Sequence, residues 1–473
     1  MALEMLPSAS PAPGDLSTSL RAGLSRARRL GRAVVVSRTE TLDELPDPFE
    51  LFAAAERRGE PRFLLSGSAS SPTRPGETLL GVGRAAELRF DDPRTGAALA
   101  RDFFAALDPG RDPAERGPLL LGGQAFSPLP VEARDPAWRP FGNARFTLPE
   151  FALVRRGSRN ELTWSVRIAP EDDEKALLLR TVSRRSRFLA APSPADRVRA
   201  SLALPTGAEL SRRYASVAAR VVDAIRARAA DKVVLAEVER VEISGRLPAL
   251  PLLRGLSEAH PSCVTYALGL GDRTFLGATP ERMVAVASGR VAASAVGGTS
   301  SQSLDPLARL LHRSRKDRAE HAFVVRGIEA ALREFCAAVE VPPEPSRLGA
   351  GRVQHLWSEI RGKLEAPAHV LDLVAALHPT PAVAGTPRDR ALELIRRHES
   401  FDRGWYAGPV GWLDRAGQGE FHVALRCGLL LPGEVRLYAG AGLVEASDPA
   451  READEVELKL RALRDALVRA CGS

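Results

Sequence analysis

Hydrophobic and polar positions alternate in short runs over the first 200 residues, as expected for β-strands with one buried face. Such runs are PRFLLSG at 61–67, TLLGVGRAAELRF at 78–90, and the two arms of a predicted hairpin around 157–160. Ser, Pro and Ala clusters predict a disordered terminus over residues 1–15, and LAAPSPADR at 189–197 predicts a linker.

The second half of the chain combines helical periods with further strand-like runs. The pattern predicts helices at 208–230, 306–339, 389–399 and 449–470, strands that include 232–243 and 352–364, and Pro- and Gly-rich loops at 341–351 and 378–388. The strands follow one another in hairpins instead of alternating with helices, which predicts an antiparallel α+β fold. We divide the chain into residues 16–200, the N-terminal part of this fold, and residues 201–473, which carry the candidate chemistry.

Composition narrows the class of protein. With 44% hydrophobic and 26% charged residues, the chain predicts a globular protein with a substantial core. The net charge of +7 comes from basic residues interspersed with acidic ones, and aromatic residues are only 5%, which argues against a nucleic-acid partner. No apolar run approaches the ~18 residues of a membrane span, so no membrane partner is expected.

The cysteines are scattered, and none forms a CxxC pair: Cys263, Cys336, Cys427 and Cys471. This spacing argues against a zinc site and against a disulfide framework. It is typical of a protein in a reducing cytoplasm, which is the location we expect.

Lysine is rare in this chain. Of 66 basic residues only five are lysines: Lys175, Lys232, Lys316, Lys363 and Lys459. Lysine can act as a base or as a compact point charge, whereas arginine stays protonated. Drift in an arginine-biased sequence accounts for Lys175 and Lys363, but the other three lie inside the motifs described next.

Two helices carry acids on their hydrophobic stripe. Asp317 and Glu320 precede Val324 and Ile328 at helical spacing, and the last helix repeats the arrangement with Glu452, Glu455 and Lys459 ahead of Leu463 and Leu467. Paired carboxylates from two helices make a hard oxygen site that suits Mg²⁺. The alternative is a solvated helix start favoured by the macrodipole, and periodicity alone leaves both open.

Other polar or glycine-rich positions carry little information singly. YAGAGLV at 438–444 and SAVGGTSS at 294–301 allow close backbone approach to an anion, but such runs are mostly tight turns. Glu281 follows Pro280 at a strand start, where a carboxylate is usually exposed, and a lone His355 is usually structural.

Nine distinctive segments follow one another in the second half: DKVVLAEVE (231–239), FLGATPERMV (275–284), AVGGT (295–299), KDRAEHAFVV (316–325), VQHLWSEIRG (353–362), LHPTPAVAG (377–385), FDRGWYAGPVGW (401–412), FHVALRC (421–427) and YAGAGLVEASDPAREADEVELKL (438–460). Together they resemble the chorismate-utilising family, which includes isochorismate, salicylate, anthranilate and aminodeoxychorismate synthases. The resemblance implies antiparallel sheets packed face to face with helices outside, chorismate as substrate, Mg²⁺ as cofactor and a monomeric enzyme.

The resemblance also implies roles for single residues. Glu320 and Glu455 match the magnesium ligands, and Asp317 and Glu452 match the outer acidic pair that holds water around the metal. The remaining substrate-binding positions are the following: Gly440, Gly442 and Lys459 for the ring carboxylate, Tyr406 and Arg426 for the enolpyruvyl carboxylate, and Gly298, Thr299 and His355 around the ring.

Within the family, the resemblance favours isochorismate synthase. Lys232 matches the general base that activates water for attack on ring carbon 2, and Glu281 matches the general acid that protonates the departing 4-hydroxyl. Aminodeoxychorismate enzymes that use a lysine nucleophile carry it where this chain has Gly297, so water is the expected nucleophile. Salicylate synthase, which goes on to eliminate pyruvate, is the alternative, followed by anthranilate synthase component I and a non-catalytic chorismate-binding protein.

Two departures from the family pattern are Gly297, where alanine is usual, and Glu237, where arginine is usual. Glu237 is expected to alter the electrostatics around Lys232, and Lys316 has no role in the resemblance. The product can serve menaquinone or siderophore synthesis, and the N-terminal third favours menaquinone.

Overall fold

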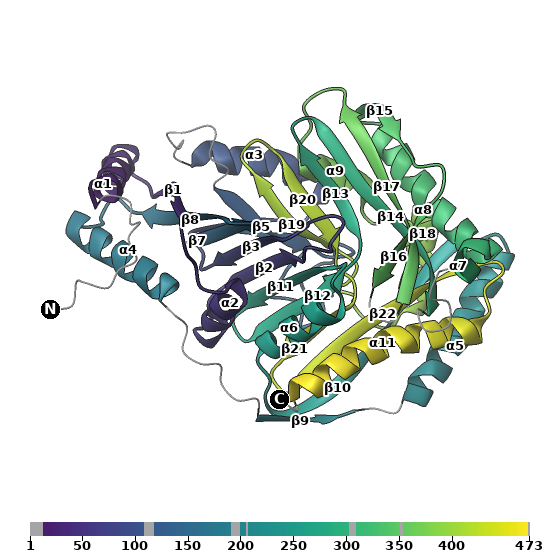
Figure 1. The fold of residues 1–473 in the computed structure, drawn as a ribbon. Coiled ribbons are helices and arrows are strands. Elements are labelled where there is room, and N and C mark those ends of the chain that lie inside the picture. Colours follow the sequence, from purple (N-terminus) through teal and green to yellow (C-terminus); the bar gives the residue numbers. More distant parts are fainter. Residues whose placement is uncertain are drawn as a thin grey trace.

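The computed structural model describes residues 13–107, 118–190, 199–204, 207–301, 309–350 and 353–471. Its strands form two large, wholly antiparallel sheets, which confirms the predicted α+β class (Figure 1). The described helices are α1 (Pro13–Leu30), α2 (Pro48–Arg57), α3 (Gly96–Ala106), α4 (Glu174–Leu189), α5 (Gly207–Arg226), α6 (Ala249–Ala259), α7 (Arg309–Arg313), α8 (Arg315–Arg333), α9 (Val370–Leu377), α10 (Arg388–His398) and α11 (Pro449–Cys471).

The first sheet runs through the strands in the order β1 (Val34–Leu42), β8 (Arg159–Ile168), β7 (Phe151–Arg156), β3 (Glu77–Val82), β2 (Arg62–Gly67), β11 (Val264–Leu270), β12 (Arg273–Thr279), β21 (Cys427–Leu431), β22 (Glu434–Val444), β10 (Lys232–Arg246) and β18 (Gly385–Thr386), with β9 (Arg199–Ala203) paired to β10. The predicted hairpin around 157–160 is the β7–β8 turn. Since β2 pairs with β11, strands from before and after residue 200 meet in one sheet.

The second sheet has the order β15 (Cys336–Glu340), β17 (Val353–Leu364), β14 (Arg290–Ser301), β13 (Arg282–Ala287), β20 (Gly419–Val423), β19 (Pro409–Asp414), β5 (Leu119–Gln124), β6 (Ala144–Leu148) and β4 (Ala86–Phe90), with β16 (Ser346–Ala350) paired to β17. Again the early and late parts of the chain share the sheet, here through β5 and β19.

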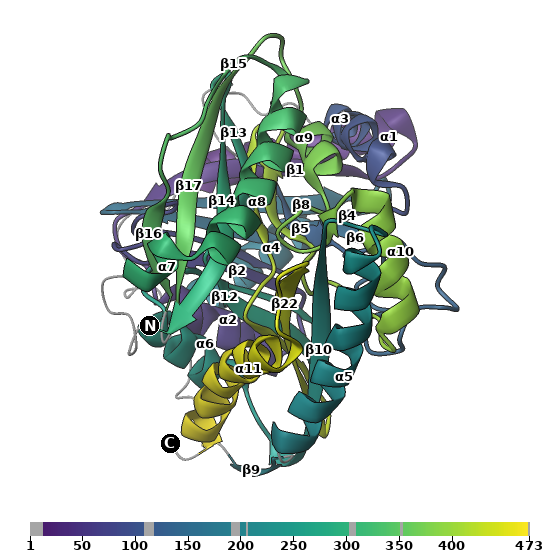
Figure 2. The same cartoon turned by 90° about the vertical axis from the view of Figure 1, so that its right-hand side faces the viewer.

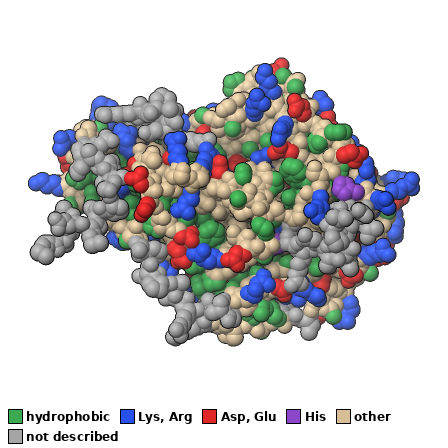
Figure 3. All heavy atoms as spheres, in the orientation of Figure 1, with side chains coloured by type: hydrophobic (Ala, Val, Ile, Leu, Met, Phe, Trp, Pro, Cys, Tyr) green, Lys and Arg blue, Asp and Glu red, His purple; other side chains and the backbone are tan. Residues whose placement is uncertain are grey.

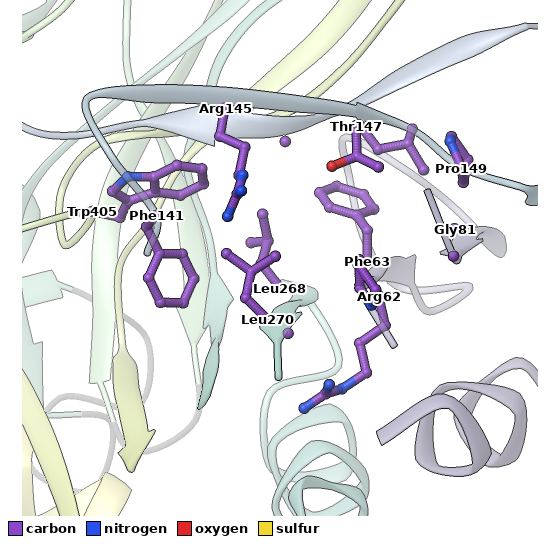
Figure 4. A pocket seen from close by; sticks show the side chains of 15 residues that line it. Arg62, Phe63, Gly81, Phe141, Arg145, Thr147, Pro149, Leu268, Leu270 and Trp405 are labelled. Carbon is purple, nitrogen blue, oxygen red and sulfur yellow. The ribbon is translucent and has the colours of Figure 1, made fainter. Parts of the chain in front are cut away.

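The two sheets pack closely against each other. A Cβ added to Gly81 of β3 would lie 2.3 Å from Leu121 Cδ1 of β5. Between the sheets, a cavity of ≈ 30 Å³ is lined by both, including Phe63 of β2 and Trp405 (Figure 4). The cavity is therefore small, and the approach of Leu121 to Gly81 shows that the two sheets are in direct contact there.

Some predicted boundaries were wrong. The helix predicted at 306–339 ends at Arg333, and Cys336–Glu340 forms β15 because those residues pair with β17. The loop predicted at 341–351 contains β16, which also pairs with β17. Residues 1–12 of the predicted terminus and 191–197 of the predicted linker lie outside the described residues, and Pro13 already begins α1.

The surface agrees with the charge pattern read from the sequence. On the face shown in Figure 3, Lys and Arg side chains are interspersed with Asp and Glu. None of the described helices is both long enough and apolar enough to cross a membrane.

Candidate active site

The predicted site residues come from elements that meet on one side of the molecule. Figure 2 looks onto this side, where α8, α11 and α5 lie over β14, β22 and β10. Lys232 begins β10, Glu281 lies between β12 and β13, and the predicted metal ligands lie on α8 and α11. The fold therefore brings together two acidic helices and the strand that carries the predicted base.

Lys232, Glu320 and Gly442 form the centre of this region. Lys232 is fully buried, and its Nζ lies 3.3 Å from Glu320 Oε1. A Cβ at Gly442 would lie 2.4 Å from Glu320 Oε1 and 3.0 Å from Lys232 Cε, so a side chain there would displace the Glu320 carboxylate. Gly442 therefore lets both charged side chains approach the backbone of β22.

The outer acids also have partners. Ser314 caps α8 by accepting a hydrogen bond from Asp317 N, which places that acid in the first turn. On α11, the buried Glu452 pairs with Lys316 of α8, with Nζ 2.6 Å from Oε1. This ion pair joins the starts of the two helices and assigns Lys316 a contact that the resemblance did not provide.

Glu455 and Lys459 lie one turn apart on α11. Lys459 Nζ lies 2.8 Å from Glu455 Oε1 and donates a hydrogen bond to Gly440 O at 2.7 Å. Burial raises the pKa of Glu455, but Lys459, Lys316 and the Thr299 hydroxyl outweigh it and hold that pKa below its usual value. Glu455 is therefore an ionised, half-buried carboxylate beside the glycine strand.

The four carboxylates fit a magnesium ion in their chemistry. Carboxylate oxygens are the hard donors that Mg²⁺ prefers, and they come from facing helices. Within the described ranges, however, no three Asp, Glu, His or Cys side chains converge into a ready-made metal cage. In this arrangement three of the four carboxylates instead contact lysines.

Glu281 is buried, contrary to what its position at a strand end suggested. Only 2% of the residue is exposed, and no described residue donates a hydrogen bond to Glu281 Oε1. Burial raises the pKa of Glu281 to about 8, although the nearby Lys232 cation opposes the shift. A carboxyl group that stays protonated near neutral pH is suited to act as a general acid.

His355 links Arg426 to the loop at residues 298–299. The guanidinium can only donate, so Arg426 Nη2 donates to His355 Nε2 at 2.5 Å, and the ring proton lies on Nδ1. Nδ1 then donates to Gly298 O at 3.0 Å and lies 3.3 Å from Thr299 Oγ1. The Thr299 side chain also hydrogen-bonds Glu455. A series of hydrogen bonds therefore connects Arg426, at the predicted enolpyruvyl site, with the acidic centre.

His355 is neutral in this network. Burial, together with the nearby Arg426 and Lys459 cations, lowers the pKa of His355 to about 3. Gly298 has φ +66°, and a Cβ there would lie 2.7 Å from Asp317 Cβ, so this position requires glycine.

Tyr406 and Arg426 lie in neighbouring loops that are joined by a backbone hydrogen bond. Ala407 N donates to Ala424 O at 2.8 Å, and Ala407 and Arg426 both adopt positive φ, +63° and +47°. Tyr406 stacks on Tyr438 with ring centroids 5.3 Å apart. A Cβ at Gly440 would lie 3.1 Å from Tyr406 Oη, so this tyrosine also borders the glycine strand.

The two departures have local explanations. A Cβ at Gly297 would lie 2.9 Å from His321 Cα, so glycine lets α8 approach β14 closely. Glu237 is an odd number of residues from Lys232 and points to the other face of β10, where it pairs with Arg213 at 2.9 Å. The expected influence of Glu237 on Lys232 is therefore not supported by a contact.

Sequence reasoning missed several residues of this region. His321 Nε2 lies 2.9 Å from Ser358 Oγ, and burial, with Lys232 nearby, lowers the pKa of His321 to about 4. Arg403 forms a buried ion pair with Glu399 and donates to Val234 O at 2.8 Å, which braces the strand of Lys232. His321 directly follows Glu320 in the sequence, but no sequence signal indicated the Arg403 contact.

Hollows detected elsewhere do not coincide with this region. A hollow of ≈ 450 Å³ lies near Glu56, Arg246 and Pro432, and none of the predicted site residues lines it. The identification of the candidate site rests on residue chemistry and on contacts.

Comparison with known proteins agrees with this reading. The family model described as "Chorismate binding enzyme" matches residues 22–468. The salicylate biosynthesis isochorismate synthase of Pseudomonas aeruginosa is 34% identical over 459 residues, 94% of this chain and 92% of that protein. An isochorismate synthase of Bacillus subtilis is 29% identical over 463 residues, 94% and 96% of the two chains. The menaquinone-specific isochorismate synthase from Escherichia coli shares the fold, with a TM-score of 0.74 at 24% identity over 95% of this chain and 100% of that one.

Proposed function

The chain belongs to the chorismate-binding enzyme family, and from that premise we propose that it is an isochorismate synthase. It adds water to ring carbon 2 of chorismate and releases the 4-hydroxyl as water. The observation that carries this proposal is the burial of Lys232 together with Glu281, whose pKa burial raises to about 8.

The two residues divide the proton transfers between them. Lys232 takes a proton from the incoming water, and Glu281 gives a proton to the departing hydroxyl. The charge of Lys232 lowers the pKa of Glu281, and a neutral Lys232 does not. The neutral form of Lys232 therefore favours the protonated form of Glu281. One proton is taken up and one is released, which makes the reaction an isomerisation.

The carboxylates of the substrate are held by different parts of the site. Arg426, preset by His355, offers a planar fork to the enolpyruvyl carboxylate, with Tyr406 beside it. The ring carboxylate lies near Lys459 and the backbone of Gly440 and Gly442. This positioning directs carbon 2 toward Lys232.

A magnesium ion would be held by Glu320 and Glu455, with Asp317 and Glu452 as the outer pair. When bound, it supplies positive charge that neutralises the ring carboxylate of the substrate. The hard oxygen donors on the two helices support this assignment.

The rate should fall at alkaline pH because Glu281 must be protonated. With the Glu281 pKa near 8, we expect log kcat/KM to lose about one unit per pH unit above that value. The measurement is a profile from pH ~6 to ~10 in one ionic-strength-matched buffer series. A rate that keeps rising above pH ~9 would contradict the role of Glu281 as the acid.

The product is the direct test of the proposed function. Purified enzyme with chorismate and Mg²⁺ should give an equilibrium mixture of chorismate and isochorismate from either side, because an isomerisation of this kind has little driving force. Ammonia or glutamine should have no effect, since Lys232 and Glu281 serve the entry of water and the loss of hydroxide, and the turn at Gly297 has no nucleophilic lysine. Pyruvate formed in step with salicylate would make the protein a salicylate synthase, and an ammonia-dependent aminated product would overturn the role of Lys232.

We also propose that the enzyme works as a monomer in a reducing cytoplasm. The four cysteines are free thiols, of which three are buried, which supports the reducing location. Light scattering during size-exclusion chromatography measures the molar mass in solution and so tests whether the enzyme is a monomer.

A further inference from the structure

The acidic centre contains its own cations. Each of three carboxylates contacts a different lysine: Lys232–Glu320 at 3.3 Å, Lys316–Glu452 at 2.6 Å and Lys459–Glu455 at 2.8 Å. These are three of the five lysines in the chain. A sequence that otherwise uses arginine has therefore kept lysine where carboxylates gather.

Lys316 interacts with three carboxylates of the centre. Its charge interacts with Glu452, Glu455 and Glu320, whereas the direct contact is with Glu452 alone. The Glu452 side chain is 2% exposed, so an unpaired charge there would be costly. The Lys316 side chain is 28% exposed, which leaves it a path toward solvent.

A metal ion held by Glu320 and Glu455 would meet the positive charge of these lysine ammonium groups. Lys232 and Lys459 contact the two ligands, and Lys316 contacts the neighbouring Glu452. Like charges a few ångströms apart repel each other strongly where the effective dielectric constant is low. A divalent cation that enters this centre is therefore repelled by any ammonium group that stays there. Lysine suits a replaceable cation because it is a compact charge on a flexible stem, whereas an arginine fork binds carboxylates bidentately.

We propose that Lys316 is the resident counter-ion of the acidic centre, which holds Glu452 until Mg²⁺ binds and then moves away from it. This inference rests on the proposed function, because it takes Glu320 and Glu455 as magnesium ligands. In the metal-free protein Lys316 stabilises the facing starts of α8 and α11. The same contact lowers the affinity for Mg²⁺.

The test compares Lys316→Gln with Lys316→Arg in calorimetric titrations of the full-length protein with Mg²⁺ alone. Lys316→Gln should bind Mg²⁺ about fivefold more tightly or better, because one repelling charge is gone. Lys316→Arg keeps the charge and should stay within about twofold of wild type or bind more weakly. Lys175→Gln, an exposed position on α4, is the matched control and should leave the affinity unchanged.

The wild-type protein provides a second measurement that does not depend on the folding of a variant. Lys316 is acetylated with a limiting amount of an amine-reactive reagent, and the acetylated fraction is measured by mass spectrometry. This fraction should increase when Mg²⁺ is added. If Lys316 has only a structural role, Mg²⁺ should leave its labelling unchanged or lower it, and Lys316→Gln should bind Mg²⁺ no more tightly than wild type. Either of these two results would overturn the inference.

Failure of this inference can be separated from failure of the metal assignment. If wild type binds Mg²⁺ and requires it for turnover but Lys316→Gln binds no more tightly, only the counter-ion role is wrong. If wild type neither binds Mg²⁺ nor loses activity in excess chelator, the magnesium site itself is wrong and the counter-ion role with it.

Discussion

Glu320→Gln and Glu455→Gln are each expected to abolish turnover of chorismate. Glutamine keeps the size of the side chain but removes the charge that a hard cation requires from its ligands. Excess chelator should likewise abolish the activity of wild type, and added Mg²⁺ should restore it. The measurement is the initial rate of isochorismate formation at saturating chorismate, with circular dichroism to check that each variant is folded.

The matched control for these variants is Glu329→Gln on the same helix. Glu329 pairs with Arg333 on the outer part of α8, so its charge serves only a surface ion pair. This variant should keep wild-type activity. Full activity of the wild-type enzyme in excess chelator would refute the magnesium assignment, whatever the variants do.

Lys232→Arg is expected to lower kcat by at least ~100-fold, the usual scale for loss of a general base. Arginine keeps the positive charge beside Glu320 but does not supply a neutral amine. KM should change much less than kcat, because Lys232 is not among the residues that hold the substrate carboxylates. Steady-state kinetics of purified protein separate these two effects.

A second substitution guards against steric disruption at Lys232. The site is fully buried and bordered by Gly442, so arginine has little additional space. Lys232→Gln is smaller and should show the same loss of kcat, while Lys175→Arg on the exposed face of α4 should show none. If Lys232→Arg turned over at the wild-type rate, Lys232 would have only an electrostatic or structural role.

The acidic helices could be predicted because their signal is local. Glu320 and Glu452 occur at helical spacing from hydrophobic residues, and Val324, Ile328 and Leu463 are indeed buried. The same periodicity could not choose between a solvated helix start and a shared site. That choice depends on what faces the helix, which is a property of the packed molecule.

Glu281 shows the limit of reading single positions. A carboxylate at a strand end is usually exposed, and nothing in the neighbouring residues indicates otherwise. Its burial results from strands that pair from distant parts of the chain, as when Val423 N donates to Glu281 O at 3.1 Å. Burial then raises the pKa of Glu281 and makes the residue a proton donor near neutral pH.

By itself, the sequence determined the antiparallel α+β class and the family, and it predicted the residues to which the proposed chemistry is assigned. These follow from short-range patterns and from motifs whose order is written along the chain. The tertiary structure alone decided which charges meet: Lys316 with Glu452, Lys232 with Glu320, and Arg426 with His355. It also decided that β15 and β16 are strands, because pairing with β17 satisfies their backbone groups. Contacts between residues far apart in sequence depend on the packing of whole elements, and no local pattern encodes them.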